Sequence, residues 1–284
     1  MRAFVTGVIL MAIWAGANGA WAQLQMAPQD EPQRVFAGST QTISVRWRNP
    51  GNEMIETDVR MRTMQLSSAT AALVDESPWK TLRVLPGQTI VETVALAFPV
   101  VRAETRFLVQ WLEGSNHVTG ASEVFVYPTN LLSELRTVVG KDGVLGVFDP
   151  QNELKDLLRN AKVDFVDLGN TELEKFRGRL AIIGPLNPKT PADCVGTAQI
   201  KAMAGNNVSV VWVPPPAGDA PSAKEKLQPS FYAVPENQTA AVIVQPEMLA
   251  NLSGNPRSQL NLIYFCKLAL SSEPLTLPSV KKQL

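Results

Sequence analysis

The chain has 284 residues, of which 45% are hydrophobic and 18% charged, and its 26 Lys and Arg balance its 26 Asp and Glu. This length predicts two domains, and the apolar fraction is ordinary for a globular protein. A net charge of zero gives no general attraction to nucleic acid or to an anionic membrane, so neither is an expected partner. One His and two Cys cannot form a His-rich or Cys-rich metal site, although carboxylates alone could still hold a hard cation. We expect no metal and no other cofactor.

The first 22 residues have the layout of a secretory signal peptide. Arg2 precedes an apolar stretch over residues 5–17, and Ala20-Trp21-Ala22 offers the small-x-small pattern that signal peptidase cleaves. We therefore expect cleavage after Ala22 and a periplasmic or secreted mature protein without a membrane span. The alternative is an uncleaved anchor, which the short apolar stretch disfavours because a helical span needs about 20 residues.

Residues 33–127 consist of short runs in which apolar and polar side chains alternate. Ile43, Val45 and Trp47, for example, are separated by single polar residues, which is typical of a strand with one buried face. About seven such runs, separated by turn residues, predict an antiparallel sandwich.

The order of the turns in this region suggests a family. The chain passes from an alternating strand to an Asn49-Pro50-Gly51 turn, then to a Leu85-Pro86-Gly87-Gln88 turn and an aromatic strand. This order resembles the immunoglobulin-like adhesion or linker modules of exported bacterial proteins. The resemblance covers about a third of the chain and implies a structural role.

Residues 143–270 show apolar strands that alternate with amphipathic helices. Val144–Phe148 and Leu180–Ile183 are apolar throughout, which is typical of strands buried on both faces. Between them, residues 154–161 carry apolar side chains at the spacing of one helix face. Helices between buried strands imply crossover connections and a parallel sheet, so we predict a three-layer α/β domain of flavodoxin-like or Rossmann-like type.

The predicted fold class is therefore an all-β immunoglobulin-like sandwich followed by this α/β domain. The predicted boundaries are a signal peptide at 1–22, the sandwich at 23–128, a linker helix at 129–142, the α/β domain at 143–270 and a flexible tail at 271–284.

The second domain also resembles a known family. Its segments follow one another in the order strand–helix–strand, LAIIGP at 180–185, a helix, and VSVVWVPPP at 208–216. This order is similar to the class I glutamine amidotransferase-like fold. In active members a Cys follows a strand on a sharp Gly-flanked turn, and a His and an acid complete the triad. Here Cys194 precedes the corresponding strand and no His follows His117. The resemblance therefore implies that the active site has been lost.

The residues themselves also argue against catalysis. A Ser- or Cys-based triad needs an imidazole, and the single His, His117, lies in a predicted hairpin loop. The Gly-rich loops that hold phosphates are absent from the sequence. We expect no enzyme activity. Cys194 and Cys266 are expected to be free or buried thiols, with a disulfide between them as the alternative.

The carboxyl ends of parallel strands form the rim where open α/β sheets bind ligands. The candidate binding residues at that rim are Asp149, Gln151, Asn152, Gly184 and Asn187. Alternatively, Asp149 and Asn152 only cap a helix and turn the chain, because Asp and Asn are the usual residues there.

The charged residues of the helix after Asn152 are interpreted as its exposed face: Glu153, Lys155, Asp156 and Arg159.

Three tryptophans lie in the predicted sandwich. Trp47 and Trp111 lie on apolar faces of alternating strands and are expected in the core. Trp79 follows Ser77-Pro78 and is expected to be exposed, where its ring could stack on a sugar.

These observations favour an exported, non-catalytic scaffold protein of the bacterial cell envelope that binds another envelope protein. The first alternative is an accessory protein that binds a carbohydrate or another small ligand near Asp149 or Trp79. The second is a hydrolase with an unrecognised carboxylate site, which would need two carboxylates within about 10 Å in one cleft. An extended apolar patch would favour protein binding, and a concave pocket with polar groups would favour ligand binding.

Overall fold

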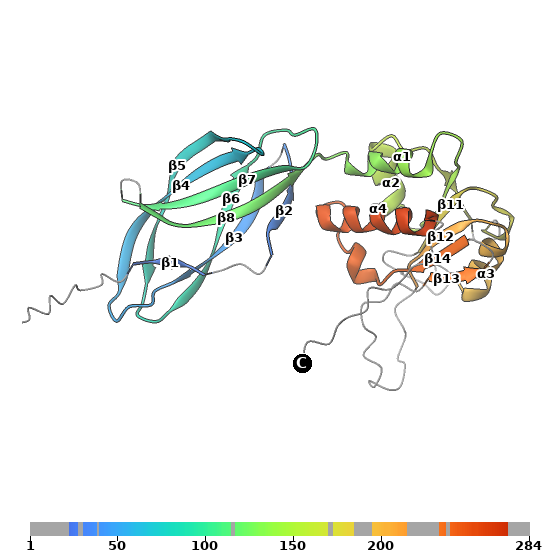
Figure 1. Ribbon diagram of the computed structural model, residues 1–284. Coiled ribbons are helices and arrows are strands. Elements are labelled where there is room, and N and C mark those ends of the chain that lie inside the picture. Colours follow the sequence, from blue (N-terminus) through green and yellow to red (C-terminus); the bar gives the residue numbers. More distant parts are fainter. Residues whose placement is uncertain are drawn as a thin grey trace, which may run out of the picture.

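The computed structural model describes residues 23–27, 31–38, 40–114, 117–169, 173–184, 195–214, 233–236 and 239–271. The predicted signal peptide, the tail beyond Ser271, Asn187 and Cys194 lie outside the described residues. Figure 1 shows two parts, one built of strands and the other of strands and helices.

The first part consists of eight strands in two sheets. The strands are β1 (Gln25–Met26), β2 (Gln33–Phe36), β3 (Thr40–Arg48), β4 (Ile55–Leu66), β5 (Ala71–Val84), β6 (Thr89–Ala97), β7 (Thr105–Glu113) and β8 (His117–Tyr127). One sheet has the order β1-β3-β6 and the other the order β2-β8-β7-β4-β5. Neighbouring strands are antiparallel except for β2 and β8, which run parallel.

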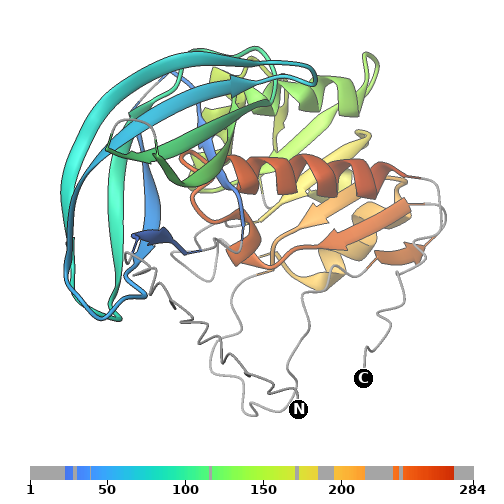
Figure 2. The ribbon, with the colours of Figure 1, turned by 60° about the vertical axis from the view of Figure 1, so that its left-hand side comes forward.

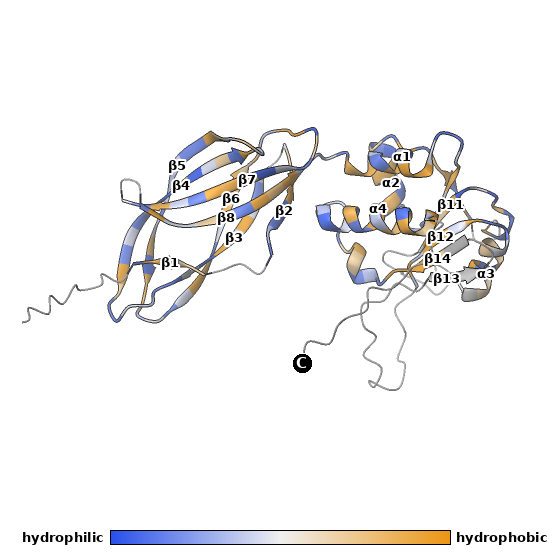
Figure 3. Ribbon diagram, viewed as in Figure 1, coloured by the Kyte–Doolittle hydropathy of each residue, from blue (hydrophilic) through white to orange (hydrophobic). Residues whose placement is uncertain are grey.

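The alternation in the sequence places one set of side chains between these sheets. On β3, Ile43, Val45 and Trp47 are buried while their neighbours face solvent, and the same alternation is visible along the strands in Figure 3. Trp111 on β7 is fully buried in the same core. The prediction that Trp47 and Trp111 pack in the core is confirmed.

Tyr127 is a buried group whose ionisation lowers the free energy of unfolding at alkaline pH. It is 4% exposed at the end of β8. Burial, with a hydrogen bond to Glu104 acting in the same direction, raises the pKa of Tyr127 to about 12 from the ordinary 10.0. Because this pKa is higher in the folded state, ionisation favours the unfolded chain. The contribution of Tyr127 is complete below about pH 10 and is lost as the pH rises through about 12.

We therefore expect the free energy of unfolding to fall less steeply at alkaline pH in Tyr127→Phe than in the wild type. Urea denaturation at about pH 9 and about pH 11 measures this difference. Tyr264→Phe, at a half-exposed position on the second part, is the control. Equal alkaline losses in the wild type and Tyr127→Phe would contradict the assignment.

The second part is built on a six-stranded sheet of order β10-β9-β11-β12-β14-β13. Its strands are β9 (Leu145–Phe148), β10 (Val166–Asp167), β11 (Leu180–Ile183), β12 (Ser209–Trp212), β13 (Ala233–Glu236) and β14 (Thr239–Ile243). Its helices are α1 (Leu135–Val139), α2 (Glu153–Asn160), α3 (Thr197–Gly205) and α4 (Pro256–Leu270), with 3-10 turns η1 (Leu131–Glu134), η2 (Leu173–Lys175) and η4 (Pro246–Leu249). The strands are parallel except for β13, which pairs antiparallel with β14.

Each face of this sheet carries its own hydrophobic core. Val147, Ile182 and Val211 pack on the face that α1, α2 and α4 cover. Ala181 and Val210 pack on the opposite face, with α3. Figure 2 shows α4 lying across the first of these faces.

The predicted fold class, an immunoglobulin-like sandwich followed by a three-layer flavodoxin-like or Rossmann-like domain, is wrong. Both parts contain a mixed sheet, since β2 runs parallel to β8 and β13 runs antiparallel to β14. Helices are few: among the described residues, α2, α3 and α4 have eight residues or more, and only the three-residue η2 lies between β10 and β11. The physical reason is that an apolar run shows that a strand is buried, but it does not show whether the neighbouring strands run parallel or antiparallel to it.

The predicted linker helix is part of the second core. Leu132 in η1 and Leu135 and Val139 in α1 are buried beside α4 and the sheet. Between the two parts, Arg257 Nη1 on α4 lies 2.5 Å from Glu31 Oε2. Both side chains are exposed, so this ion pair adds little stability. No helix within the described ranges is long and apolar enough to span a membrane.

Candidate functional site

At the carboxyl ends of the parallel strands, the connections leave toward opposite faces of the sheet. The helix after β9, α2, packs on one face of the sheet, whereas α3, which follows β11, packs on the other. Strands β9 and β11 are neighbours. Such a switch point leaves a crevice outside the strand ends, which is where open α/β sheets hold ligands.

Asp149 follows β9 at this edge, but its carboxylate is already engaged. It is 1% exposed and accepts hydrogen bonds from three backbone N–H groups. The donors are Gln151 to Oδ1 at 3.2 Å, and Leu154 and Lys155 to Oδ2 at 2.7 and 3.3 Å. The N–H groups of Leu154 and Lys155 belong to the first turn of α2. Asp149 is therefore the cap of that helix.

The other rim residues that the structure describes, Gln151, Asn152 and Gly184, have three different environments. Asn152 is exposed in the left-handed region at φ 61°, and its side chain makes no capping hydrogen bond. Gln151 is half-buried, and both polar atoms of its amide are buried without a hydrogen-bond partner. Gly184 is buried where a Cβ would lie 2.6 Å from Cβ of Val213, so it permits close packing of β11 and β12.

Trp79 is not an open stacking platform. Its ring centroid lies 4.8 Å from that of Trp111 and 6.4 Å from that of Trp47. The Lys80 Nζ lies over the same ring, 5.3 Å from its centroid. Trp79 thus packs at the border of the core of the first part.

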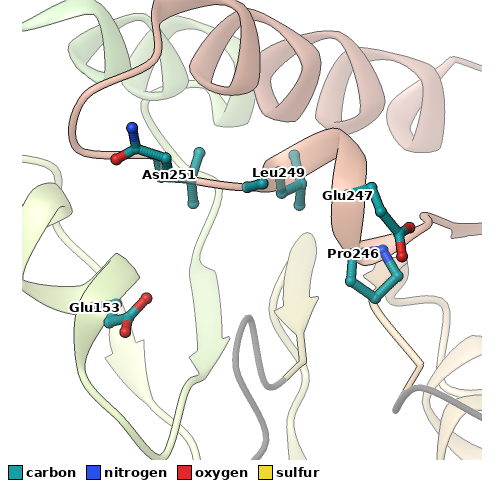
Figure 4. A pocket seen from close by; sticks show the side chains of 7 residues that line it. Glu153, Pro246, Glu247, Leu249 and Asn251 are labelled. Carbon is teal, nitrogen blue, oxygen red and sulfur yellow. The ribbon is translucent and has the colours of Figure 1, made fainter.

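A pocket of about 250 Å³ opens at the same edge of the sheet, beside the start of α2 (Figure 4). It is lined by Glu153, Pro246, Glu247, Leu249, Ala250, Asn251 and Leu252. Glu153 is the first residue of α2, and the others belong to η4 and the turn that follows it. In Figure 4, the Glu153 side chain extends from α2 toward the segment that carries Asn251. Glu247 lies on η4, at the opposite end of the labelled residues.

Helix α4 fixes the wall of this pocket. Its side chains donate three hydrogen bonds to alternate backbone carbonyls of the wall: Ser258 Oγ to Ala250 at 2.7 Å, Gln259 Nε2 to Leu252 at 2.8 Å, and Asn261 Nδ2 to Met248 at 3.0 Å. Asn251 takes up φ 54°, and its Oδ1 accepts a hydrogen bond from Gly254 N at 3.2 Å. The pocket is therefore preformed by contacts within the protein.

Sequence reasoning missed this pocket. Glu153 was interpreted only as exposed surface, and Glu247 and Asn251 were not candidates. Applying the strand-end rule to β14 as well as to β9 would have pointed to the segment after residue 244. Lys155 was also misassigned, since it is 5% exposed and its Nζ lies 2.6 Å from Asp167 Oδ1.

The described residues hold no nucleophile paired with an imidazole. Cys266 is a free thiol buried in α4, and burial raises its pKa. His117 is exposed at the start of β8 in the other part. No group of three His, Cys, Asp or Glu within the described ranges could hold a metal ion. Glu153 and Glu247 line one pocket. A shared cleft is one of the two conditions of the hydrolase alternative, which stays a prediction.

Comparisons with known proteins identify no family. No family model matches the sequence, and no curated protein does. Among solved structures, a β-glucosidase from Listeria innocua aligns at 13% identity and a TM-score of 0.29, over 38% of this chain and 16% of its own. An alkylpurine DNA glycosylase of Pseudomonas fluorescens aligns at 13% identity and a TM-score of 0.30, over 38% of this chain and 31% of its own.

The chain thus spans less than a third of the length of these two proteins. Likeness at this level carries no argument about fold or activity. The resemblances to immunoglobulin-like modules and to the amidotransferase-like family stay predictions.

Proposed function

We propose that this protein is an exported, non-catalytic component of the bacterial cell envelope that binds another envelope protein. Export is supported by the signal-peptide pattern of residues 1–22. Protein binding is supported by one structural feature, the free edge of strand β5.

Strand β5 is the outermost strand of the five-stranded sheet and pairs with β4 on one side. Among the described residues no strand pairs with its other side. Its first five residues, Ala71–Asp75, are exposed, with Leu73 59% exposed. An edge strand presents unpaired N–H and C=O groups that can pair with a strand of another protein.

An apolar surface adjoins this edge. Leu73 lies opposite Met64 on β4, and Met64 lies opposite Leu108 on β7, so the three form a row across the sheet. Met64 and Leu108 are only half-buried. The row gives a partner strand apolar area to cover in addition to backbone hydrogen bonds.

Both halves of β5 carry features that protect an edge. In the second half, Pro78 lacks an N–H group, the pairing shifts next to Trp79, and Lys80 adds charge. In the first half, the pairing shifts next to Val74, and Asp75 and Glu76 are charged. The first three residues, Ala71–Leu73, precede both shifts and carry no charge and no Pro, so we expect a partner strand to add there.

A photo-crosslinking amino acid at position 73 of the full chain, expressed in its own cells, tests the proposal. We expect one reproducible adduct with an envelope protein, and no such adduct from position 100, where Val100 is 84% exposed outside the strands. The double variant Leu73→Lys, Val74→Lys should weaken binding of that partner at least tenfold, while Val100→Lys should not. Equal crosslinking from both positions, or none from position 73, would refute the proposal.

A second candidate function is binding of a small ligand by an accessory protein. The preformed pocket between α2 and η4 favours it, because concave sites with a few polar groups are typical of ligand binding. Sugar stacking on Trp79 gains no support, since that ring packs on Trp111.

A further inference from the structure

We propose that Gln23 is a modification site: once the signal peptide is removed after Ala22, Gln23 cyclises to pyroglutamate. This inference rests on the proposed export of the protein, because only a chain cleaved at that position begins with Gln23. It is independent of the partner that the β5 edge would bind.

The reaction uses two groups of one residue. The α-amino nitrogen of Gln23, freed by cleavage, attacks Cδ of the side-chain amide of the same residue. A new C–N bond closes a lactam ring, the bond between Cδ and Nε2 breaks, and Nε2 leaves as ammonia with the proton that the amine gives up. An α-amino group titrates near neutral pH, so a useful share of it is the unprotonated nucleophile there. The step is internal to Gln23 and consumes no oxidant or other reagent.

The structure places Gln23 where this ring can close. Gln23 is exposed and lies outside β1, whose pairing with β3 joins Gln25 to Arg48 and Met26 to Trp47. An exposed residue ahead of the first strand can fold its side chain back onto its own amine without breaking the pairing of β1.

The residue that follows Gln23 is part of the core of the first part. Leu24 is 1% exposed and packs in the core between the two sheets. Met26 lies against β8, where its Sδ accepts a hydrogen bond from Ser122 Oγ at 3.7 Å, and a Cβ at Gly120 would lie 2.4 Å from its own Cβ. Residues 24–26 therefore connect the sheet of β3 to the sheet of β8, and loss of Leu24 would leave a cavity between them.

A free α-amine would expose this segment to stepwise trimming. Chain termini are preferred sites of proteolysis, and terminal strands fray at little cost in free energy. An aminopeptidase that removed Gln23 would reach Leu24 next. Pyroglutamate has no free α-amine for such an enzyme to act on, so cyclisation at Gln23 protects a core side chain one residue away.

Mass spectrometry of the full chain expressed in its own cells tests the inference. We expect a mature chain that starts at residue 23 and is lighter by one ammonia, about 17 Da, than its sequence requires. The tryptic peptide 23–34 contains no Lys, so its α-amine is the one site for an amine-specific label, and we expect no labelling. Gln23→Ala should abolish the mass loss and restore labelling. Gln25→Ala, which removes the same residue type at an exposed position within β1, should change neither result.

The same spectra separate failure of the inference from failure of the proposed export. A chain that starts at residue 23 and keeps a reactive α-amine would overturn cyclisation and leave export standing. A chain cut at another position, or left uncut in the membrane fraction, would overturn cyclisation at Gln23 and keep export. An uncut chain in the cytoplasm would overturn both.

Digestion with a broad-specificity aminopeptidase tests the protective role. The wild type should keep its length, whereas Gln23→Ala should be trimmed past Leu24 and then unfold at a lower urea concentration. Removal of the cyclised residue with pyroglutamyl peptidase should make the wild type equally sensitive. Equal resistance of the wild type and Gln23→Ala would overturn the protective role.

Discussion

Trp111→Ala is expected to lower the free energy of unfolding by about 4 kcal/mol, within the range for truncation of a buried aromatic side chain. Trp111 is fully buried, and its ring lies edge-on to Trp47 with the centroids 5.7 Å apart. Its other close neighbour is Trp79, at 4.8 Å. The indole Nε1 donates a hydrogen bond to Ser122 Oγ at 3.2 Å, so alanine would leave a cavity and also remove this donor.

Urea denaturation followed by far-UV circular dichroism measures this loss without depending on tryptophan fluorescence. Trp79→Ala is the matched control, because Trp79 belongs to the same cluster but is only half-buried, and we expect it to cost about half as much. A Trp111→Ala protein within about 1 kcal/mol of the wild type would show that the cluster does not hold the two sheets together.

The strands of the first part could be predicted from the sequence because each has one buried face. The alternation at Ile43, Val45 and Trp47 is a local property of β3, and it survives in the structure. The direction of pairing is not local. Strand β2 runs parallel to β8, about 90 residues further along the chain, and nothing in its four residues indicates that choice.

In the second part too, the sequence predicted strands but not how they are connected. Leu180–Ile183 was recognised as a buried strand because every side chain is apolar. The helix expected between each pair of strands depends on how the chain crosses over. In the described part of the connection from β10 to β11, the helical element is the three-residue turn η2. Lys155 looked like solvated surface because a charge rarely lies inside, yet Asp167 on β10 pairs with it.

The strand-end rule could have pointed to the segment after β14, but no local sequence pattern shows that this segment and α2 form one pocket. Glu153 comes from α2, whereas Glu247 and Asn251 lie almost 100 residues later. The wall depends on polar side chains of α4, such as Gln259, that bind backbone carbonyls and leave no periodic signal. The strand-end rule gave the correct edge of the sheet but assigned Asp149 to a ligand, and the structure assigns it to α2.

Asp149→Ala is expected to lower the free energy of unfolding by about 2–3 kcal/mol, more than a typical exposed cap contributes. The variant would leave the N–H groups of Gln151, Leu154 and Lys155 without their acceptor. The last two lie in a buried part of the structure, where an unpaired donor is costly. Asp149→Asn keeps one acceptor oxygen and should lie between the wild type and alanine.

Asn152→Gly separates this cap from the residue that immediately precedes α2. Asn152 has φ 61° and makes no capping hydrogen bond, so glycine should change stability by less than about 0.5 kcal/mol. Amide hydrogen exchange at Leu154 and Lys155 should accelerate in Asp149→Ala and stay unchanged in Asn152→Gly. Unchanged exchange in Asp149→Ala would contradict the capping role of its carboxylate.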